Sequence, residues 1–379
     1  GLTPLIGMLQ GGGNTQGIGR VFRNALAANA SVAVLLTAVM YTVYCFVDKL
    51  GQPEELLPHI RPYFVLQLIS LLFIMLFNGF RQFAEGLTDT RTPMWILLGG
   101  NALNIFGNYL LIYGSFGFPE WGLFGAGVST LVSRIVMLLV FIGVVAVARR
   151  YKVYREAILR SRFNRNDFMQ LNALGWPIAL QMGMETAAFS LSAIMVGWLG
   201  SIPLAAHQIM ISVSTIGFMV YYGMGAALAV RVSHFMGQKD FPNLRRAVNS
   251  GMGIILSLAI VASLFFYLAR TPIIYSFTED HEVMIVVSSL IFSLIVYQFG
   301  DALQITFANA LRGTTDVKPM MWIAFFSYFI VALPVGYLCG FTWGGGVVGV
   351  WVAFPAGLFT AGFLFWLRFR YRLQQLMKK

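Results

Sequence analysis

Two carboxylates lie inside long apolar stretches of this sequence, Glu185 within residues 171–199 and Asp301 within residues 283–310. A charged side chain in the centre of a bilayer is costly, and such residues usually serve a function. Neither stretch contains a Lys or Arg to neutralise its acid, so burial favours the protonated form of each carboxyl. We therefore expect a site that exchanges a cation or a proton. A hydrogen bond from each acid to a neighbouring helix is the structural alternative.

Each acid shares a helical face with a hydrogen-bonding group and an aromatic ring. Residues three or four positions apart are neighbours on a helix, which places Gln181 and Phe189 beside Glu185, and Tyr297 and Gln304 beside Asp301. A carboxylate next to an aromatic face suits a lipophilic cation, through charge and cation–π contact. The pattern favours cation binding by both stretches.

Apolar stretches long enough to cross a bilayer, about 20 residues each, recur along the whole chain. Of its 379 residues, 58% are hydrophobic and 11% are charged, and the mean hydropathy is +0.74; soluble domains carry about 25% charged residues. We expect the end of one span at residues 1–10 and ten whole spans, at 22–47, 62–86, 93–114, 122–148, 171–199, 204–232, 247–269, 283–310, 319–340 and 346–367. The sequence predicts an all-α polytopic membrane protein.

Lys and Arg residues concentrate in alternate connections between these spans. Most of the 26 basic residues fall on one side, with clusters at residues 149–165 and 368–379. The positive-inside rule places that side, and with it the C-terminus, in the cytoplasm. The formal charge of +11 is thus explained by membrane topology, and we expect no nucleic-acid partner.

One motif occurs twice. FAEGLTDTRTPMWI at residues 83–96 and LRGTTDVKPMMWI at 311–323 share Gly, Thr, Asp, Met, Trp and Ile in the same order, so that Asp89 corresponds to Asp316. Further along, Gly122 matches Gly346, and the Gly13 turn matches Gly237. These matches indicate that the chain is a tandem repeat.

The repeat divides the chain into two lobes. We expect an N-terminal lobe at residues 1–148, a basic cytoplasmic linker at 149–167 and a C-terminal lobe at 168–379. Six spans follow the linker, whereas the counterparts of the first span and most of the second would precede Gly1. Because six spans preserve orientation, two six-helix bundles would be related by a parallel pseudo-two-fold repeat, with a substrate site near the midplane.

The remaining residues and motifs indicate no metal site, disulfide or catalytic site. Cys45 and Cys339 lie in apolar spans without metal-ligand spacing, so we expect neither a metal site nor a disulfide. The chain contains no GxxxxGK[ST] phosphate loop and no hydrolytic constellation, which indicates a protein that is not an enzyme. Arg134, inside the span 122–148, is expected to pair with another helix or with carbonyl groups, and His207 to be structural.

Several motifs resemble the MATE (multidrug and toxic-compound extrusion) family, and its NorM-like branch most. They are FRQFAEGLTDTRTPM at 80–94, NALNIFGNYLLIYGSFGFPEWGLFGAGV at 101–128, GWP at 175–177 followed by Glu185, AAHQI at 205–209, and Asp301 followed by ALRG at 310–313 and Asp316. The resemblance covers the whole chain. The order and spacing of the motifs are more specific than any single motif.

The resemblance implies twelve helices in two six-helix lobes and export of organic cations in exchange for Na⁺ or H⁺, without other cofactors. By position, Glu185 and Asp301 match the acids of the branch's seventh and tenth helices, where Na⁺ or H⁺ would bind. Tyr297, Phe189 and Gln208 match residues that line its C-lobe cavity. These residues are expected to bind the coupling ion and the substrate cation.

The chain departs from the family pattern in its N-terminal lobe. The family has an acidic residue in its first helix. This residue has no counterpart here, because the resemblance implies a chain truncated at its N-terminus, without that helix. The fifth helix carries Asn101, Asn104 and Asn108 and lacks the Asp that another branch uses for Na⁺. Coupling through the C-lobe acids is the expected arrangement.

These observations favour a secondary antiporter of the bacterial inner membrane that works by alternating access as a monomer in contact with lipid. Its substrates would be drug-like, lipophilic cations. Two alternatives stay open. The chain could be a non-transporting remnant, or a related flippase of lipid-linked substrates, although a flippase would need several basic residues in its cavity and only Arg134 is available.

Overall fold

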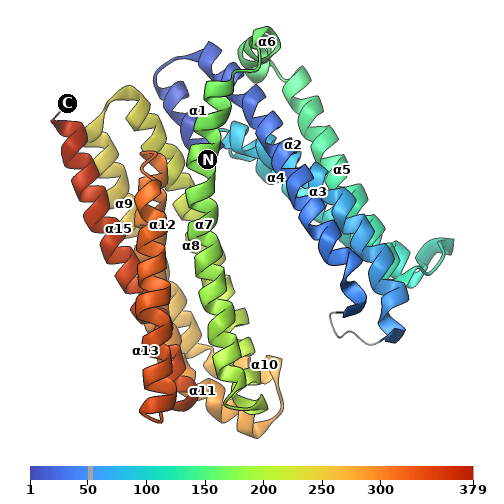
Figure 1. Cartoon of the computed structure of the whole chain (residues 1–379), viewed down its shortest axis with the longest axis vertical. Coiled ribbons are helices and arrows are strands. Elements are labelled where there is room, and N and C mark those ends of the chain that lie inside the picture. The colour runs from blue at the N-terminus through green and yellow to red at the C-terminus, as the bar shows by residue number, and fades with distance from the viewer. Residues whose placement is uncertain (50–53, 379) are drawn as a thin grey trace. The chain divides into compact units, whose positions relative to one another are not determined.

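The computed structural model describes residues 1–49 and 54–378, and no strand occurs in that part of the chain. The chain forms two compact units, Leu2–Asn172 and Ala173–Lys379, the second of which includes Gly1. The boundary between them falls inside helix α7 (Arg165–Gly197). Figure 1 shows both units as bundles of long helices.

The N-terminal unit ends with the start of α7 and consists of long helices joined by short turns. In chain order its elements are α1 (Leu2–Gly11), α2 (Thr15–Cys45), η1 (Val47–Lys49), η2 (Glu54–Leu56), α3 (Leu57–Gly86), α4 (Arg91–Tyr113), η3 (Ser115–Gly117), α5 (Gly122–Val147), η4 (Arg149–Tyr151) and α6 (Lys152–Arg160). The segment predicted as a linker thus contains a helix, α6, which packs on α2.

The C-terminal unit holds most of α7 and the rest of the chain. Its further elements are α8 (Ser201–Gln238), α9 (Phe241–Leu268), α10 (Arg270–Phe277), α11 (His281–Gly313), α12 (Lys318–Phe325), η5 (Phe326–Ala332), α13 (Leu333–Tyr337), η6 (Leu338–Thr342), α14 (Gly346–Trp351) and α15 (Ala353–Met377). Helix α11 is its central element and packs against α8, α9 and α15.

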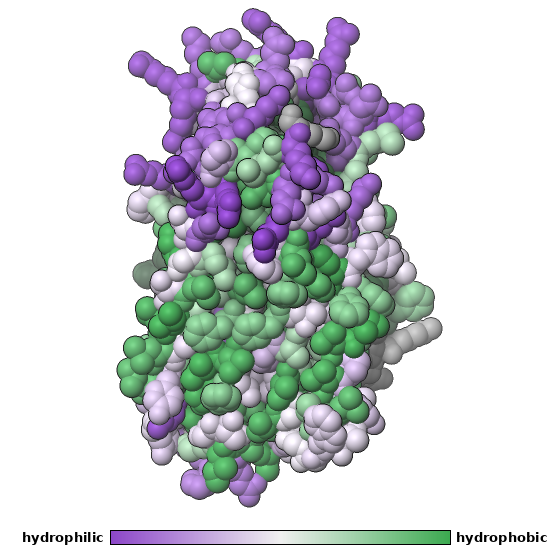
Figure 2. Space-filling view, turned by 90° about the vertical axis from the view of Figure 1, so that its left-hand side faces the viewer, coloured by the Kyte–Doolittle hydropathy of each residue, from purple (hydrophilic) through white to green (hydrophobic). Residues whose placement is uncertain are grey.

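Ten helical segments within the described residues are long and apolar enough to cross a membrane, and α1 supplies the partial span at the N-terminus. The predicted all-α polytopic fold is confirmed. Most helices run past the predicted spans by one or two turns, because polar and charged residues continue the helix beyond the apolar part. Figure 2 shows hydrophilic residues at one end of the visible face and hydrophobic residues below them.

The predicted span 319–340 is not a regular helix. Two π-helical segments, η5 and η6, flank the short α13, which contains Pro334. Proline has no N–H, and its ring clashes with the carbonyl group four residues earlier, which here belongs to Ile330 in η5. A local shift to π geometry, which often marks functional sites, accommodates the proline.

The repeated motif forms the same turn in both units. Thr88 and Thr315, which correspond in the two copies, both have left-handed backbone, with φ of 63° and 57°. Asp89 N donates to Ala84 O, and Asp316 N donates to Leu311 O, both at about 2.9–3.0 Å. The tandem repeat is therefore visible in backbone geometry as well as in sequence.

The match between Gly13 and Gly237 was wrong by two positions. The left-handed residue after α8 is Lys239, with φ of 58°, and it corresponds to Gly13, with φ of 69°. The next residue, Asn14 or Asp240, caps the following helix by accepting a hydrogen bond from the backbone N–H three residues on. The two turns correspond through their capping geometry, whereas Gly237 lies inside α8.

In both copies the turn aspartate pairs with an arginine from a later segment. Arg150 Nη1 lies 3.0 Å from Asp89 Oδ2, and Arg368 Nε lies 2.6 Å from Asp316 Oδ2. Asp89 also accepts hydrogen bonds from Thr92 and from the Tyr151 hydroxyl, the latter at 2.6 Å. Burial opposes ionisation of Asp89, but these hydrogen bonds and Arg150 outweigh it and lower its pKa.

Candidate substrate and ion site

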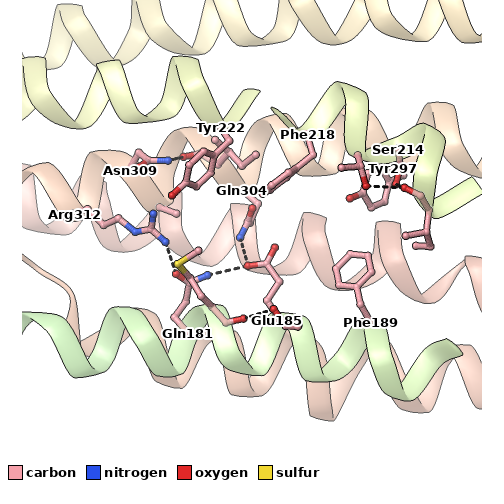
Figure 3. A pocket seen from close by; sticks show the side chains of 16 residues that line it. Gln181, Glu185, Phe189, Ser214, Phe218, Tyr222, Tyr297, Gln304, Asn309 and Arg312 are labelled. Atoms are coloured by element: carbon pink, nitrogen blue, oxygen red, sulfur yellow. Dashed lines mark hydrogen bonds between the residues drawn. The ribbon is translucent and has the colours of Figure 1, made fainter. Parts of the chain in front are cut away.

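A cavity of about 340 Å³ opens inside the C-terminal unit, between α7, α8 and α11. Its walls are mainly apolar and aromatic, with a few convergent polar groups, as is typical of ligand sites. The lining residues labelled in Figure 3 are Gln181, Glu185, Phe189, Ser214, Phe218, Tyr222, Tyr297, Gln304, Asn309 and Arg312.

Glu185 is the one carboxylate among the residues that line this cavity. Its Oε2 accepts hydrogen bonds from Gln181 Nε2 at 3.0 Å and from Gln304 Nε2 at 3.2 Å. The first donor belongs to the same helix, four residues earlier, and the second comes from α11. Gln304 Nε2 also lies 3.3 Å from the Tyr328 hydroxyl of η5. Two amides therefore hold one carboxylate oxygen in place.

Arg312 also lines the cavity, which the sequence analysis missed. Helix α11 continues to Gly313, so the span limit at 310 wrongly left Arg312 in a turn. Its Nη2 donates to Gln181 Oε1 at 2.8 Å. Because a guanidinium only donates, the Gln181 amide group must turn its NH₂ toward Glu185. The sequence suggested that no cation lies near Glu185. In the structure, Arg312 donates to Gln181, and Gln181 in turn donates to Glu185.

Phe189 and Tyr297 lie on the other side of Glu185 from Arg312, whereas Tyr222 lies on the Arg312 side (Figure 3). Phe189 meets Tyr297 edge to face, with ring centroids 6.3 Å apart, and stacks on Phe354 at 4.8 Å. A cation between Glu185 and these rings would face a carboxylate and a π surface together. The positive charge of Arg312 lies at the opposite end.

Asp301 is fully buried in α11, with 1% of its surface exposed, and it is not among the cavity-lining residues. Its Oδ2 has no hydrogen-bond partner among the described residues, and neither does the amide of Gln298, three residues earlier. Gln304, expected beside Asp301, instead donates to Glu185. Buried polar atoms without partners mark sites for water or ions, so Asp301 stays a candidate ion ligand behind the cavity wall.

Of the other residues predicted to line the site, three line the cavity and one does not. Gln181, Phe189 and Tyr297 line the cavity together with Glu185. Gln208 does not; it lies exposed on α8, because its position on the helix turns it away from the α7–α11 interface. His207 is buried next to it and accepts a hydrogen bond from Trp351 Nε1 at 3.1 Å.

The N-terminal unit contains a different buried polar group. Arg134 of α5 donates to Gln67 Oε1 at 3.3 Å and to the hydroxyl of Ser70, both on α3. It forms no ion pair within the described residues. The expected interhelical pairing of Arg134 therefore exists, with neutral partners.

Ten bilayer-length spans and a solute-sized cavity with a buried carboxylate define a multi-pass helical membrane protein of the transporter class. The sequence profile of the MatE family matches residues 1–110 and 177–338. The chain belongs to the MatE family.

Curated relatives agree with this assignment. The chain is 30% identical to the "Multidrug resistance protein NorM" of Photobacterium profundum over 384 residues, which cover 98% of the chain and 82% of that protein. Identity to the Vibrio cholerae NorM protein is 29%, with 97% of the chain and 82% of that protein covered.

Solved structures share the fold. A crystal structure of "MATE in the straight conformation" matches with a TM-score of 0.91 and 19% identity, over 100% of the chain and 84% of that protein. The "outward-facing conformation of a multidrug resistance MATE family transporter" matches with a TM-score of 0.89 and 19% identity, with the same coverage.

Proposed function

We propose that the chain exports lipophilic organic cations across the bacterial inner membrane in exchange for Na⁺ or H⁺. The observation that carries this proposal is the single carboxylate, Glu185, held by two amides in an apolar cavity of about 340 Å³ with aromatic rings beside it. The names of the NorM relatives support multidrug export.

The charge–charge and cation–π energies favour a cationic substrate on the side of Glu185 where Phe189 and Tyr297 lie. Two opposite charges 4 Å apart attract by about 4 kcal/mol at an effective dielectric constant of 20. A desolvated cation–π contact adds about 2 kcal/mol. The carboxylate thus supplies the larger part of the attraction, and Phe189 with Tyr297 favours cations that also carry apolar surface.

Antiport then follows because the coupling ion and the substrate compete for Glu185. A proton or Na⁺ at Glu185 neutralises the charge that attracts the substrate, so ion and substrate occupy the site in turn. Asp301, one turn before Gln304 on α11, is proposed as the second ion ligand. Alternating access by the two predicted lobes would expose the site to each side of the membrane, with the basic ends and the C-terminus in the cytoplasm.

The test is efflux of a fluorescent lipophilic cation from cells that express the chain. Wild type is compared with Glu185→Gln and Asp301→Asn across pH, with and without Na⁺, and with Glu156→Gln as an exposed-acid control on α6. We expect both cavity variants to lose efflux and the control to keep it. Unchanged efflux in both variants at equal expression would refute the proposed site, and the Na⁺ or pH arm identifies the coupling ion.

A further inference from the structure

A second hollow lies in the C-terminal unit, apart from the Glu185 cavity. It is a groove of about 440 Å³ between α8 and α9, two helices that run antiparallel on either side of the short turn at Lys239 and Asp240. Its lining residues are Met224, Ala227, Leu228, Arg231, Phe235, Asn243, Arg246, Ala247, Ser250, Gly251 and Ile254. None of them serves the proposed export function.

The groove is cationic at the end near the turn. Arg231 of α8 and Arg246 of α9 both line it and are exposed, and none of the described lining residues is acidic. Neither arginine forms an ion pair within the described residues. The nearby carboxylate of Asp240 is occupied by the cap of α9, where it accepts from Asn243 N and Nδ2. Two guanidinium groups from different helices therefore remain available to an anion.

The groove becomes apolar toward the middle of the spans. Met224 lies seven residues before Arg231 on α8, and Ile254 lies eight residues after Arg246 on α9. At 1.5 Å per residue the lining changes over about 10 Å, from two arginines to the apolar side chains of Met224, Leu228 and Ile254. Ile254 is 48% exposed. Gly251 allows α9 to approach Leu228 of α8 closely, since a Cβ there would lie 2.9 Å from Leu228 Cδ1.

We propose that this groove binds an anionic phospholipid from the leaflet at the arginine-rich end of the spans. Arg231 and Arg246 hold the phosphate of the headgroup, with Ser250 and Asn243 beside it, and an acyl chain lies along Leu228 and Ile254. Guanidinium groups bind phosphate oxygens in paired hydrogen bonds, and basic pockets between membrane helices suit such headgroups. A free phosphate ion would leave the apolar half of the groove unused.

The test is lipid retention by the purified full chain, measured by native mass spectrometry after exchange into mixed micelles of phosphatidylglycerol and phosphatidylcholine. Wild type should retain phosphatidylglycerol in preference. The double variant Arg231→Gln, Arg246→Gln should lower that retention at least fivefold. The matched control Lys239→Gln, Arg245→Gln removes the same charge from the same hairpin but from residues that do not line the groove, and it should retain the lipid.

Three outcomes would overturn the proposal. Equal loss in the control would show a diffuse charge effect, and equal retention of both lipids by wild type would show apolar binding alone. Displacement of the lipid by millimolar glycerol phosphate would indicate a phosphate site without a chain groove. Ser250→Trp, which fills the groove without changing charge, should also release the lipid; thermal unfolding confirms that each variant is folded.

Discussion

The two units place different ionisable side chains inside their apolar spans. In the N-terminal unit, Arg134 is held by the neutral groups of Gln67 and Ser70. In the C-terminal unit, two carboxylates lie inside the spans: Glu185 lines the cavity, as Arg312 does, and Asp301 is fully buried. A guanidinium stays charged under any physiological condition, whereas a carboxylate can exchange its charge for a proton or a metal ion. The two carboxylates of the C-terminal unit can therefore bind and release a cation, which Arg134 cannot.

The strongest test of this comparison replaces one group in each unit. Glu185→Gln should lower cation efflux about 30-fold or more, because truncating one partner of a buried charge pair costs about 2 kcal/mol or more. Arg134→Gln should change efflux less than threefold at equal expression. A reversal of these effects, measured in the same cells, would move the cation site to the N-terminal unit.

The repeated turn allows a second comparison between the units. Asp89→Asn should destabilise the chain by about 2 kcal/mol, because hydrogen bonds to a charged group contribute about 1.5–3 kcal/mol. Asp316→Asn should cost less, since among the described side chains Asp316 is held by Arg368, whereas Asp89 accepts from Thr92 and Tyr151 and also pairs with Arg150. Thermal unfolding in one detergent measures both.

The same aspartate predicts a pH effect on stability. The pKa of Asp89 is lowered by folding, so its contribution is fully present above the unfolded-state value of about 3.9 and is lost as pH falls through the lower folded pKa. The stability difference between wild type and Asp89→Asn should thus shrink only below about pH 4. A difference that shrinks near neutral pH would contradict the assigned ionisation.

A smaller effect is expected from the aromatic wall. Phe189→Ala should weaken binding of a quaternary ammonium dye about fivefold, because a partly desolvated cation–π contact contributes about 1 kcal/mol. Phe292→Ala, whose side chain is 75% exposed on α11, is the matched control. Fluorescence anisotropy of the purified chain measures both, and an equal loss in the control would remove Phe189 from the site.

The smallest effect concerns Arg312. Arg312→Gln removes a like charge from the cavity and should tighten binding of the same dye about threefold, or about 0.6 kcal/mol, within the range of screened charge interactions. Arg312→Lys, which keeps the charge, should bind as wild type does. Weaker binding in the Gln variant would show that orienting Gln181 matters more than the repulsion.

Much of this molecule follows from its sequence. Composition and apolar length determined ten spans, because a span must hide its backbone within one helix. The rarity of acids inside those spans singled out Glu185 and Asp301, and the duplicated motif at Asp89 and Asp316 indicated the repeat.

Tertiary structure decided which side chains meet. Gln304 shares a helical face with Asp301 yet donates to Glu185 on α7; Arg312 lies beyond the apolar span yet reaches the cavity, and Gln208 faces away from it. The reason is physical. Spacing along one helix fixes which residues share a face, but the rotation of that helix about its axis is set by packing against its neighbours, through close approaches such as that of Gly225 in α8 to Asn309 in α11.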